Sequence, residues 1–113
     1  MLVDADSASG AELVARYLQL TGKATVLGDS TSGMVNEGQL IPEKIGAGFV
    51  MPFATMVTNA KLVMSNGEEL ERRGVIPDEK CVPTAQEIIQ GADPCLEKAL
   101  ALAKKQLLQS EKH

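Results

Sequence analysis

The sequence predicts an α/β fold, on three observations. Residues 1–4 and 23–28 are short apolar stretches typical of buried strands, and residues 11–20 between them have the spacing of an amphipathic helix. A strand, a helix and a strand in this order form a βαβ unit with two parallel strands. The composition, with 44% hydrophobic and 23% charged residues, is that of an ordinary globular domain, and 113 residues allow one domain or a piece of a larger one.

The helix expected over residues 11–20 has an apolar and a polar face. The apolar face contains Leu13, Val14, Tyr17, Leu18 and Leu20. The polar face contains Glu12, Arg16 and Gln19. We expect Gly22 to end this helix.

The middle of the chain predicts a loop followed by strands. Residues 29–38 are rich in Ser, Thr and Gly, which is typical of a loop, and we expect this loop to end in a strand near Met34-Val35. Residues 46–64 are an apolar stretch interrupted by Pro52, in which two strands are expected near 48–53 and 56–64. Asn66-Gly67 favours a tight hairpin turn, and we expect the charged residues 68–74 after it to be exposed.

The last third of the chain predicts two helices. Thr84 and Glu87 form a capping box that opens a short helix, and Gly91 ends it. Asp93-Pro94 then starts a helix that runs to about residue 109, because Asp is a good N-cap and Pro suits the first helical position. The apolar stripe of that helix is Leu96, Ala99, Leu100, Ala103 and Leu107. Residues 110–113 are expected to be a frayed tail.

Composition excludes several classes of function. The net charge of −4 and the 3% aromatic content argue against a nucleic-acid partner. No apolar run reaches the roughly 18 residues of a membrane span, and no signal peptide is evident. Cys81 and Cys95 make no disulfide framework and are expected to be buried small apolar residues. The only histidine is His113, so we expect no metal site, no cofactor site and no His-based triad contained wholly in this chain.

Ser9 is the most informative candidate and has two interpretations. Ser9-x-x-Glu12 is a capping box, so Ser9 can be a simple N-cap. A serine on the turn between a strand and a helix also has an exposed hydroxyl, and the neighbouring N–H of Gly10 can bind an oxyanion at the helix N-terminus. The G-x-S-x-G motif and an S-x-x-K dyad are both absent.

The other polar positions carry weaker signals. Asp4, Asp6 and Asp29 lie near strand ends and are expected to be solvated loop caps. Residues 28–33 do not match a P-loop, because no Lys follows the last glycine. The acidic and basic residues of 68–73 are expected to form a solvated turn.

Three motifs together resemble the tail-specific (C-terminal processing) serine peptidases, a family that includes the tricorn core proteases and the retinoid-binding modules of the eye. The motifs are Ser7-Ala8-Ser9-Gly10-Ala11-Glu12, then Gly22-Lys23-Ala24-Thr25-Val26-Leu27-Gly28-Asp29-x-Thr31-x-Gly33, then Asn66-Gly67-x-x-Leu70-Glu71-x-x-Gly74-Val75-x-Pro77-Asp78. They follow the family's order and spacing. The resemblance spans nearly all of residues 1–113 but only the second half of the family's peptidase domain.

The resemblance implies a ClpP/crotonase-like fold with a βαβ spiral. It also implies that Ser9 is the nucleophile and that the N–H of Gly10 supplies half of the oxyanion hole. The sequence departs from the bacterial branch at Met34, which occupies the position of the Lys base, and at Gly38, which occupies that of a Gln. The tricorn-like branch uses a His, which would lie upstream of this chain, and an acid, for which Glu71 is the best match.

We therefore expect part of a serine endopeptidase whose partners are a polypeptide substrate and the upstream half of the same domain. The fragment is expected to be inactive alone. The alternatives are a non-catalytic module that binds peptides or apolar ligands, which Met34 motivates, and an assembly domain that self-associates through strand edges. The sequence itself does not identify the cellular compartment, and the resemblance suggests a bacterial periplasmic or extracytoplasmic protein.

Overall fold

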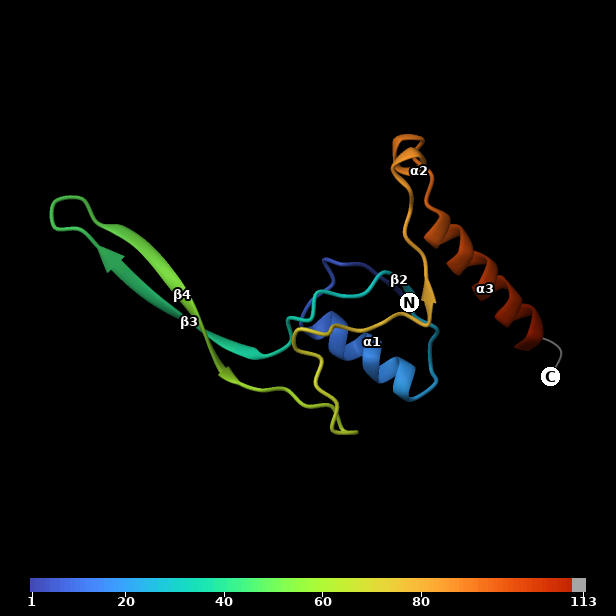
Figure 1. Ribbon diagram of the computed structural model, residues 1–113, viewed down its shortest axis with the longest axis horizontal. Helices are drawn as coiled ribbons and strands as arrows, with labels where there is room; N and C mark the ends of the chain where they lie inside the picture. Colours follow the sequence, from blue (N-terminus) through green and yellow to red (C-terminus); the bar gives the residue numbers. More distant parts are fainter. Residues whose placement is uncertain (111–113) are drawn as a thin grey trace.

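A computed structural model describes residues 1–110 of the protein (Figure 1). Its helices and strands, in chain order, are β1 (Leu2–Val3), α1 (Gly10–Leu20), β2 (Leu27–Gly28), β3 (Glu37–Ile45), β4 (Met51–Ala60), β5 (Glu79–Lys80), α2 (Ala85–Ile89) and α3 (Pro94–Ser110). This mixture of helices and strands agrees with the predicted α/β class. No helix within residues 1–110 has both the length and the apolar character needed to cross a membrane.

The predicted βαβ unit is present, with shorter strands than expected. β1 pairs in parallel with β2, α1 connects them, and β5 pairs in parallel with the other edge of β2. The register places Val3 opposite Gly28. Gly28 has a φ of +133°, and a Cβ there would collide with the carbonyl oxygen of Val3. The close approach of β1 and β2 therefore requires glycine at this position.

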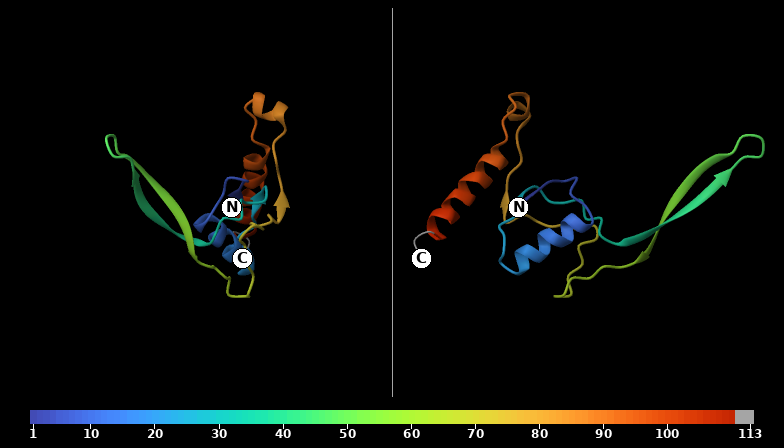
Figure 2. Two further views of the ribbon diagram at one scale, coloured as in Figure 1. Left: turned by 60° about the vertical axis from the view of Figure 1, so that its left-hand side comes forward. Right: turned by 180° about the vertical axis from the view of Figure 1, so that it is seen from behind.

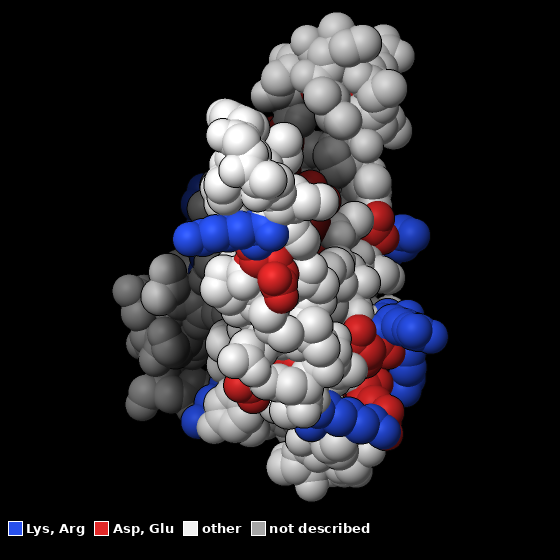
Figure 3. All heavy atoms as spheres, turned by 90° about the vertical axis from the view of Figure 1, so that its left-hand side faces the viewer, with Lys and Arg blue, Asp and Glu red and all other residues white. Residues whose placement is uncertain are grey.

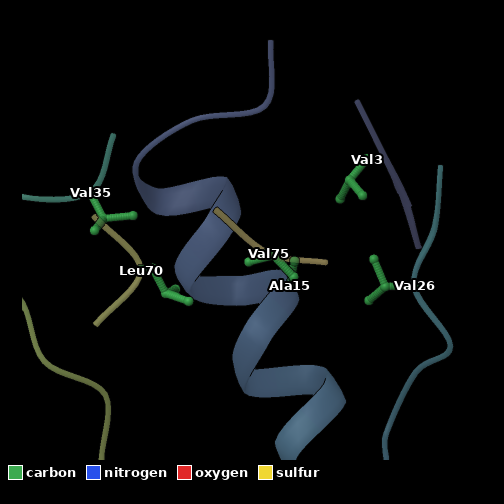
Figure 4. Close-up of a cluster of buried hydrophobic side chains, with 6 residues drawn as sticks. All are labelled: Val3, Ala15, Val26, Val35, Leu70 and Val75. Carbon is green, nitrogen blue, oxygen red and sulfur yellow. The ribbon is translucent and has the colours of Figure 1, made fainter. Parts of the chain in front are cut away.

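A small core holds the sheet, α1 and two loops together (Figure 4). Its buried members are Val3, Ala15, Val26, Val35, Leu70 and Val75. The expectation that residues 68–74 are exposed is wrong at Leu70, which is only 2% exposed, and at Gly74, which is also buried. The charged neighbours of Leu70 stay at the surface, while this one apolar side chain joins the core beside Val75.

Helix α1 turns its polar face toward the protein. Glu12 and Ala15 are the buried residues of the helix, whereas Val14 and Tyr17 of the expected apolar face are each 52% exposed. The polar face is anchored by hydrogen bonds and an ion pair. Arg16 Nε lies 2.7 Å from Glu68 Oε2, and Gln19 Nε2 donates to the carbonyl of Ile76 at 2.9 Å. Specific polar partners thus set the orientation of α1 in place of hydrophobic periodicity.

The strands expected near 48–53 and 56–64 are wrong in their boundaries. The structure has one antiparallel hairpin, in which β3 pairs with β4 and the chain reverses at residues 46–50. Gly46, with a φ of +113°, lies in this reversal. The tight turn expected at Asn66-Gly67 is also present, because the N–H of Gly67 donates to the carbonyl of Met64 and the N–H of Met64 donates to the carbonyl of Glu68, each at 2.8 Å. Pro52 lies inside β4, opposite Lys44. A two-stranded ribbon tolerates proline because each strand has an outer edge that needs no hydrogen-bond donor.

The hairpin extends away from the rest of the molecule, on the side opposite α3 (Figures 1 and 2). Every residue of β3 and β4 is exposed. The radius of gyration is 19.5 Å, whereas a compact chain of this length would have about 13 Å. The hairpin therefore contributes an extended surface and no core.

The C-terminal helices begin as predicted. Thr84 and Glu87 form the capping box of α2, and the carboxylate of Asp93 accepts the N–H of Leu96 at the start of α3. The apolar stripe of α3 is largely exposed at Leu96, Leu100 and Leu107. Ser110 is the last residue of α3 rather than part of a frayed tail, and the remainder of that expected tail, 111–113, lies outside the described residues.

Cys81 and Cys95 form a disulfide, which corrects the expectation of two separate apolar cysteines. Their Cα atoms are 5.5 Å apart, and the bond links the residue after β5 to the first turn of α3. An ion pair of 2.6 Å between Lys98 and Glu79 ties the same two elements. Two cysteines 14 residues apart give no pattern that predicts this pairing; it arises because the fold brings the end of β5 beside α3.

Candidate active site

Ser9 lies on the turn between β1 and α1 in an unusual backbone conformation. Its φ is 55° and its ψ is −121°, and it directly precedes the first residue of α1. Non-glycine residues rarely adopt positive φ, and such a conformation costs on the order of 1–3 kcal/mol. The surroundings of Ser9 must therefore hold it in place.

Two acceptors share the N–H of Ser9. The carbonyl oxygen of Met34 lies 2.9 Å away, and Glu12 Oε2 lies 3.0 Å away. Of the capping box predicted from the sequence, the half in which Glu12 accepts the N–H of Ser9 is present, while the N–H of Glu12 donates to the backbone carbonyl of Ser9 at 3.0 Å. The Ser9 side chain, however, makes no cap hydrogen bond to α1. The hydroxyl is therefore available for another interaction.

The carboxylate of Glu12 is the centre of the site. Glu12 is 0% exposed. Its Oε2 also accepts the N–H of Met34 at 2.9 Å, and its Oε1 accepts the N–H of Gly33 at 2.7 Å and the hydroxyl of Thr31. The first and second sequence motifs therefore meet at one buried carboxylate.

Thr31 extends this connection to the third motif. Its hydroxyl accepts the N–H of Val75 at 2.6 Å, and its own N–H donates to the carbonyl of Val75 at 3.1 Å. Gly74, with a φ of +67°, lies so close that a Cβ there would collide with the backbone of Thr31. Residues 9–12, 31–34 and 74–75 consequently form one hydrogen-bonded unit.

The N–H of Gly10 is the first free donor of α1. It donates to no acceptor within residues 1–110. A Cβ built on Gly10 would meet nothing within 4 Å, so the surrounding space is open. An unpaired N–H at a helix N-terminus, next to a serine hydroxyl, is the arrangement that can stabilise a developing oxyanion.

Glu71 faces the loop that leads from this unit into β3. Its Oε2 accepts the N–H groups of Val35 and Asn36, each at 3.0 Å. These hydrogen bonds, that of Asn36 first and that of Val35 second, hold the pKa of the Glu71 carboxyl below its usual value. No hydrogen bond joins Glu71 to Ser9 in the described part of the chain; the two residues are linked through Met34 and Val35.

The remaining candidates serve as turn residues or ion-pair partners. The Ser7 hydroxyl donates to Asp4 at 2.7 Å and lowers the pKa of that carboxyl. Asp29 lies 3.6 Å from Lys80. The Arg16 hydrogen bond lowers the pKa of the Glu68 carboxyl. Acidic and basic side chains accordingly lie beside one another on the face seen in Figure 3.

Two further features define what the site can do. A cleft of about 710 Å³ lies at the carboxyl ends of β1, β2 and β5, and Ser7, Asp29 and the disulfide line part of it. Within residues 1–110, no three His, Cys, Asp or Glu residues are grouped so that they could hold a metal ion. Met34, at the position where the resemblance places a Lys, is 66% exposed and has no group that can take up a proton.

Sequence reasoning missed two residues of this site. Glu12 was assigned to the exposed face of its helix, and Thr31 to a loop without a role. The usable signal was the capping-box spacing together with the Thr and Gly of the second motif. Nothing in one sequence, however, shows that both motifs converge on the same carboxylate.

Comparisons with known proteins found a matching family model and solved structures with a similar fold. The family model described as Peptidase family S41 matches residues 1–81. The tricorn protease structure superposes with a TM-score of 0.74 at 16% identity, over 94% of this chain and 10% of that one. Mature CPAF complexed with lactacystin superposes with a TM-score of 0.70 at 20% identity, over 96% of this chain and 20% of that one. None of the curated proteins matches the sequence. The chain thus spans a fifth or less of the length of these two structures.

Proposed function

Because the chain belongs to peptidase family S41, we propose that it is part of a serine endopeptidase with Ser9 as its nucleophile. One observation carries this proposal. At the start of α1, the hydroxyl of Ser9 makes no cap hydrogen bond, and it lies next to the N–H of Gly10, which is also unpaired within residues 1–110. The match to a peptidase family and the likeness to the tricorn protease support the reaction class. A polypeptide is the corresponding substrate.

The proposed reaction has two stages. Ser9 Oγ attacks the carbonyl carbon of a peptide bond and loses its proton to a general base, while the N–H of Gly10 donates to the resulting oxyanion. The tetrahedral intermediate expels the amine, which takes the proton from the base, and an ester to Ser9 remains. Water then hydrolyses this ester with the same base. Removing one oxyanion donor from such a site typically slows the reaction about 100- to 1,000-fold.

The base is proposed to lie outside residues 1–110. A histidine from an upstream part of the peptidase domain fits this role, and Glu71 would orient that histidine. The lowered pKa of Glu71 supports this assignment, because an ionised carboxylate can accept the imidazole N–H. We also propose that residues 1–113 form the second half of a ClpP/crotonase-like spiral, for which the parallel order β1-β2-β5 is the support. Without the upstream half, the chain would be inactive.

A second candidate function is a non-catalytic module that binds peptides or apolar ligands on the same fold. Met34 favours it, because its thioether replaces the base of one branch of the family. The sequence of the complete protein decides between the two. A histidine upstream supports the peptidase, and its absence supports the binding module.

Self-association through the β3–β4 hairpin is a further proposal about assembly. Each strand has one unpaired edge, and the exposed side chains include Ile41, Phe53 and Val57. Size-exclusion chromatography of the chain with and without residues 37–60 tests it. A loss of the larger species on deletion supports pairing through the hairpin, and an unchanged profile contradicts it.

A fluorophosphonate probe on the complete protein tests the peptidase proposal. The unmodified protein should be labelled, and Ser9→Ala should abolish labelling. Ser30→Ala is the matched control, because Ser30 is an exposed serine of the loop after β2. Equal labelling with and without Ser9 would show that Ser9 is not the nucleophile.

A further inference from the structure

We propose that Glu12 is a positioning residue, whose buried carboxylate holds Ser9 and the N–H of Gly10 in the geometry that acylation needs. This inference rests on the proposed function. It assigns to Glu12 no contact with the substrate. Its action is through the backbone of residues 9 and 33–34, to which it is hydrogen-bonded.

The hydrogen bonds of Glu12 use the whole carboxylate. Each oxygen accepts two hydrogen bonds. Oε1 accepts the N–H of Gly33 and the hydroxyl of Thr31, and Oε2 accepts the N–H groups of Ser9 and Met34. A carboxylate offers about four acceptor positions, so none is left over. A glutamine has one oxygen and would turn an NH₂ group toward two donors. Only the charged carboxylate satisfies this site.

A second capping box in the same chain shows that capping alone does not require this arrangement. In α2, Glu87 Oε2 accepts only the N–H and the hydroxyl of Thr84 within residues 1–110, and Glu87 is half-buried rather than fully buried. Glu12 is fully buried, and three of its four donors belong to the loop 31–34 rather than to the helix cap. Burying an ionised group is costly unless it is fully hydrogen-bonded. Such a group is retained here in contact with the candidate nucleophile.

The backbone of Ser9 is where this carboxylate acts. Ser9 keeps a φ of 55°, and its N–H is shared between Glu12 and the carbonyl of Met34. The N–H of Met34 donates to the same Glu12 oxygen, so Glu12 fixes both partners of the Ser9–Met34 hydrogen bond. A displacement of about 1 Å at a reacting group can cost about 100-fold in rate. Removing the hydrogen bonds that Glu12 makes to Ser9 and Met34 should therefore slow acylation.

The experiment measures fluorophosphonate labelling of the complete protein over time and over probe concentration. For Glu12→Gln, we expect the labelling rate constant at saturating probe to fall about 10- to 100-fold. The half-saturating probe concentration should stay unchanged, and labelling should still reach one group per chain. Glu87→Gln, the same substitution in the second capping box, should label at the original rate.

A pair of substitutions at Thr31 keeps the inference testable should Glu12→Gln fail to fold. Thr31→Ser retains the hydroxyl that donates to Glu12 and should keep nearly the original rate constant. Thr31→Val removes that donor and should lower it. Equal rate constants for these two variants would overturn the inference.

Two results separate this inference from the proposed function. A Glu12→Gln protein in which fewer chains are labelled, but each at the original rate, would show a purely structural role and overturn the inference. If the unmodified protein is not labelled at all, the proposed function fails. The positioning role of Glu12 is then tested by amide hydrogen exchange. Faster exchange at Ser9, Gly33 and Met34 in Glu12→Gln supports this role, and unchanged exchange contradicts it.

Discussion

The N–H of Ser9 donates to the carboxylate of Glu12 at 3.0 Å, across the first turn of α1, while Ser9 keeps a positive φ. The same relationship explains why two interpretations of Ser9-x-x-Glu12 coexist. The capping box supplies the carboxylate that holds an uncommon backbone conformation. That conformation leaves the serine hydroxyl without a cap hydrogen bond.

Gly74→Ala should destabilise the protein much more than Gly22→Ala. Both glycines have a left-handed φ, of 67° and 63°, which costs an alanine about 1–2 kcal/mol. Only at Gly74 would the new Cβ also collide with the backbone of Thr31, and such overpacking adds about 1–3 kcal/mol. Urea unfolding of the two variants checks this. Equal losses would contradict the tight contact between residues 31 and 74.

Glu71 should make the stability of the protein depend on pH in the acid range. Its pKa is lowered by the N–H groups of Asn36 and Val35, so the folded state favours the ionised form. This contribution is present above the ordinary glutamate pKa of about 4.3 and is lost as the pH falls through the lower value of the folded state. In Glu71→Gln, the free energy of unfolding should therefore fall less steeply as the pH is lowered through the acid range.

The control for that measurement is Glu43→Gln, which removes the same charge on the exposed hairpin without touching these hydrogen bonds. Its acid limb should match that of the unmodified protein. Identical curves for all three proteins, from urea unfolding between neutral pH and pH of about 3, would contradict the role given to Asn36 and Val35.

The disulfide between Cys81 and Cys95 should stabilise the attachment of α3. The bond closes a loop between residues 14 apart, for which the loss of unfolded-state entropy is worth about 3 kcal/mol. Replacing both cysteines by alanine should lower the free energy of unfolding by about that amount. Disulfides persist in oxidising compartments, so the protein is purified without reductant. Two thiols that react with an alkylating agent in the native protein would contradict the bond.

The sequence predicts the order of the elements better than their contacts. The helices α1, α2 and α3 were predicted near their observed positions. Their N-cap residues Ser9, Thr84 and Asp93, and the glycines that follow α1 and α2, influence only the neighbouring backbone and can therefore be recognised in the sequence. The boundaries of the long hairpin were predicted wrongly. Proline interrupts a strand that is paired on both sides, but β4 is paired with β3 alone and accommodates Pro52.

The inward face of α1 and the role of Glu12 depend on contacts between distant segments. Arg16 meets Glu68 across 52 positions, and Glu12 meets Gly33 across 21. Periodicity describes one helix at a time, so it assigned both polar residues to solvent. Ser9 was singled out as a candidate nucleophile because its hydroxyl and the adjacent N–H of Gly10 lie together in the chain and because the three motifs resemble a serine peptidase family.

The most direct test of the central claim is the mass-spectrometric location of the fluorophosphonate adduct in the complete protein. The account predicts one adduct per chain, on the peptide that contains Ser9, and a parallel loss of peptide hydrolysis. An adduct on any other serine, or full hydrolysis by Ser9→Ala, would contradict it.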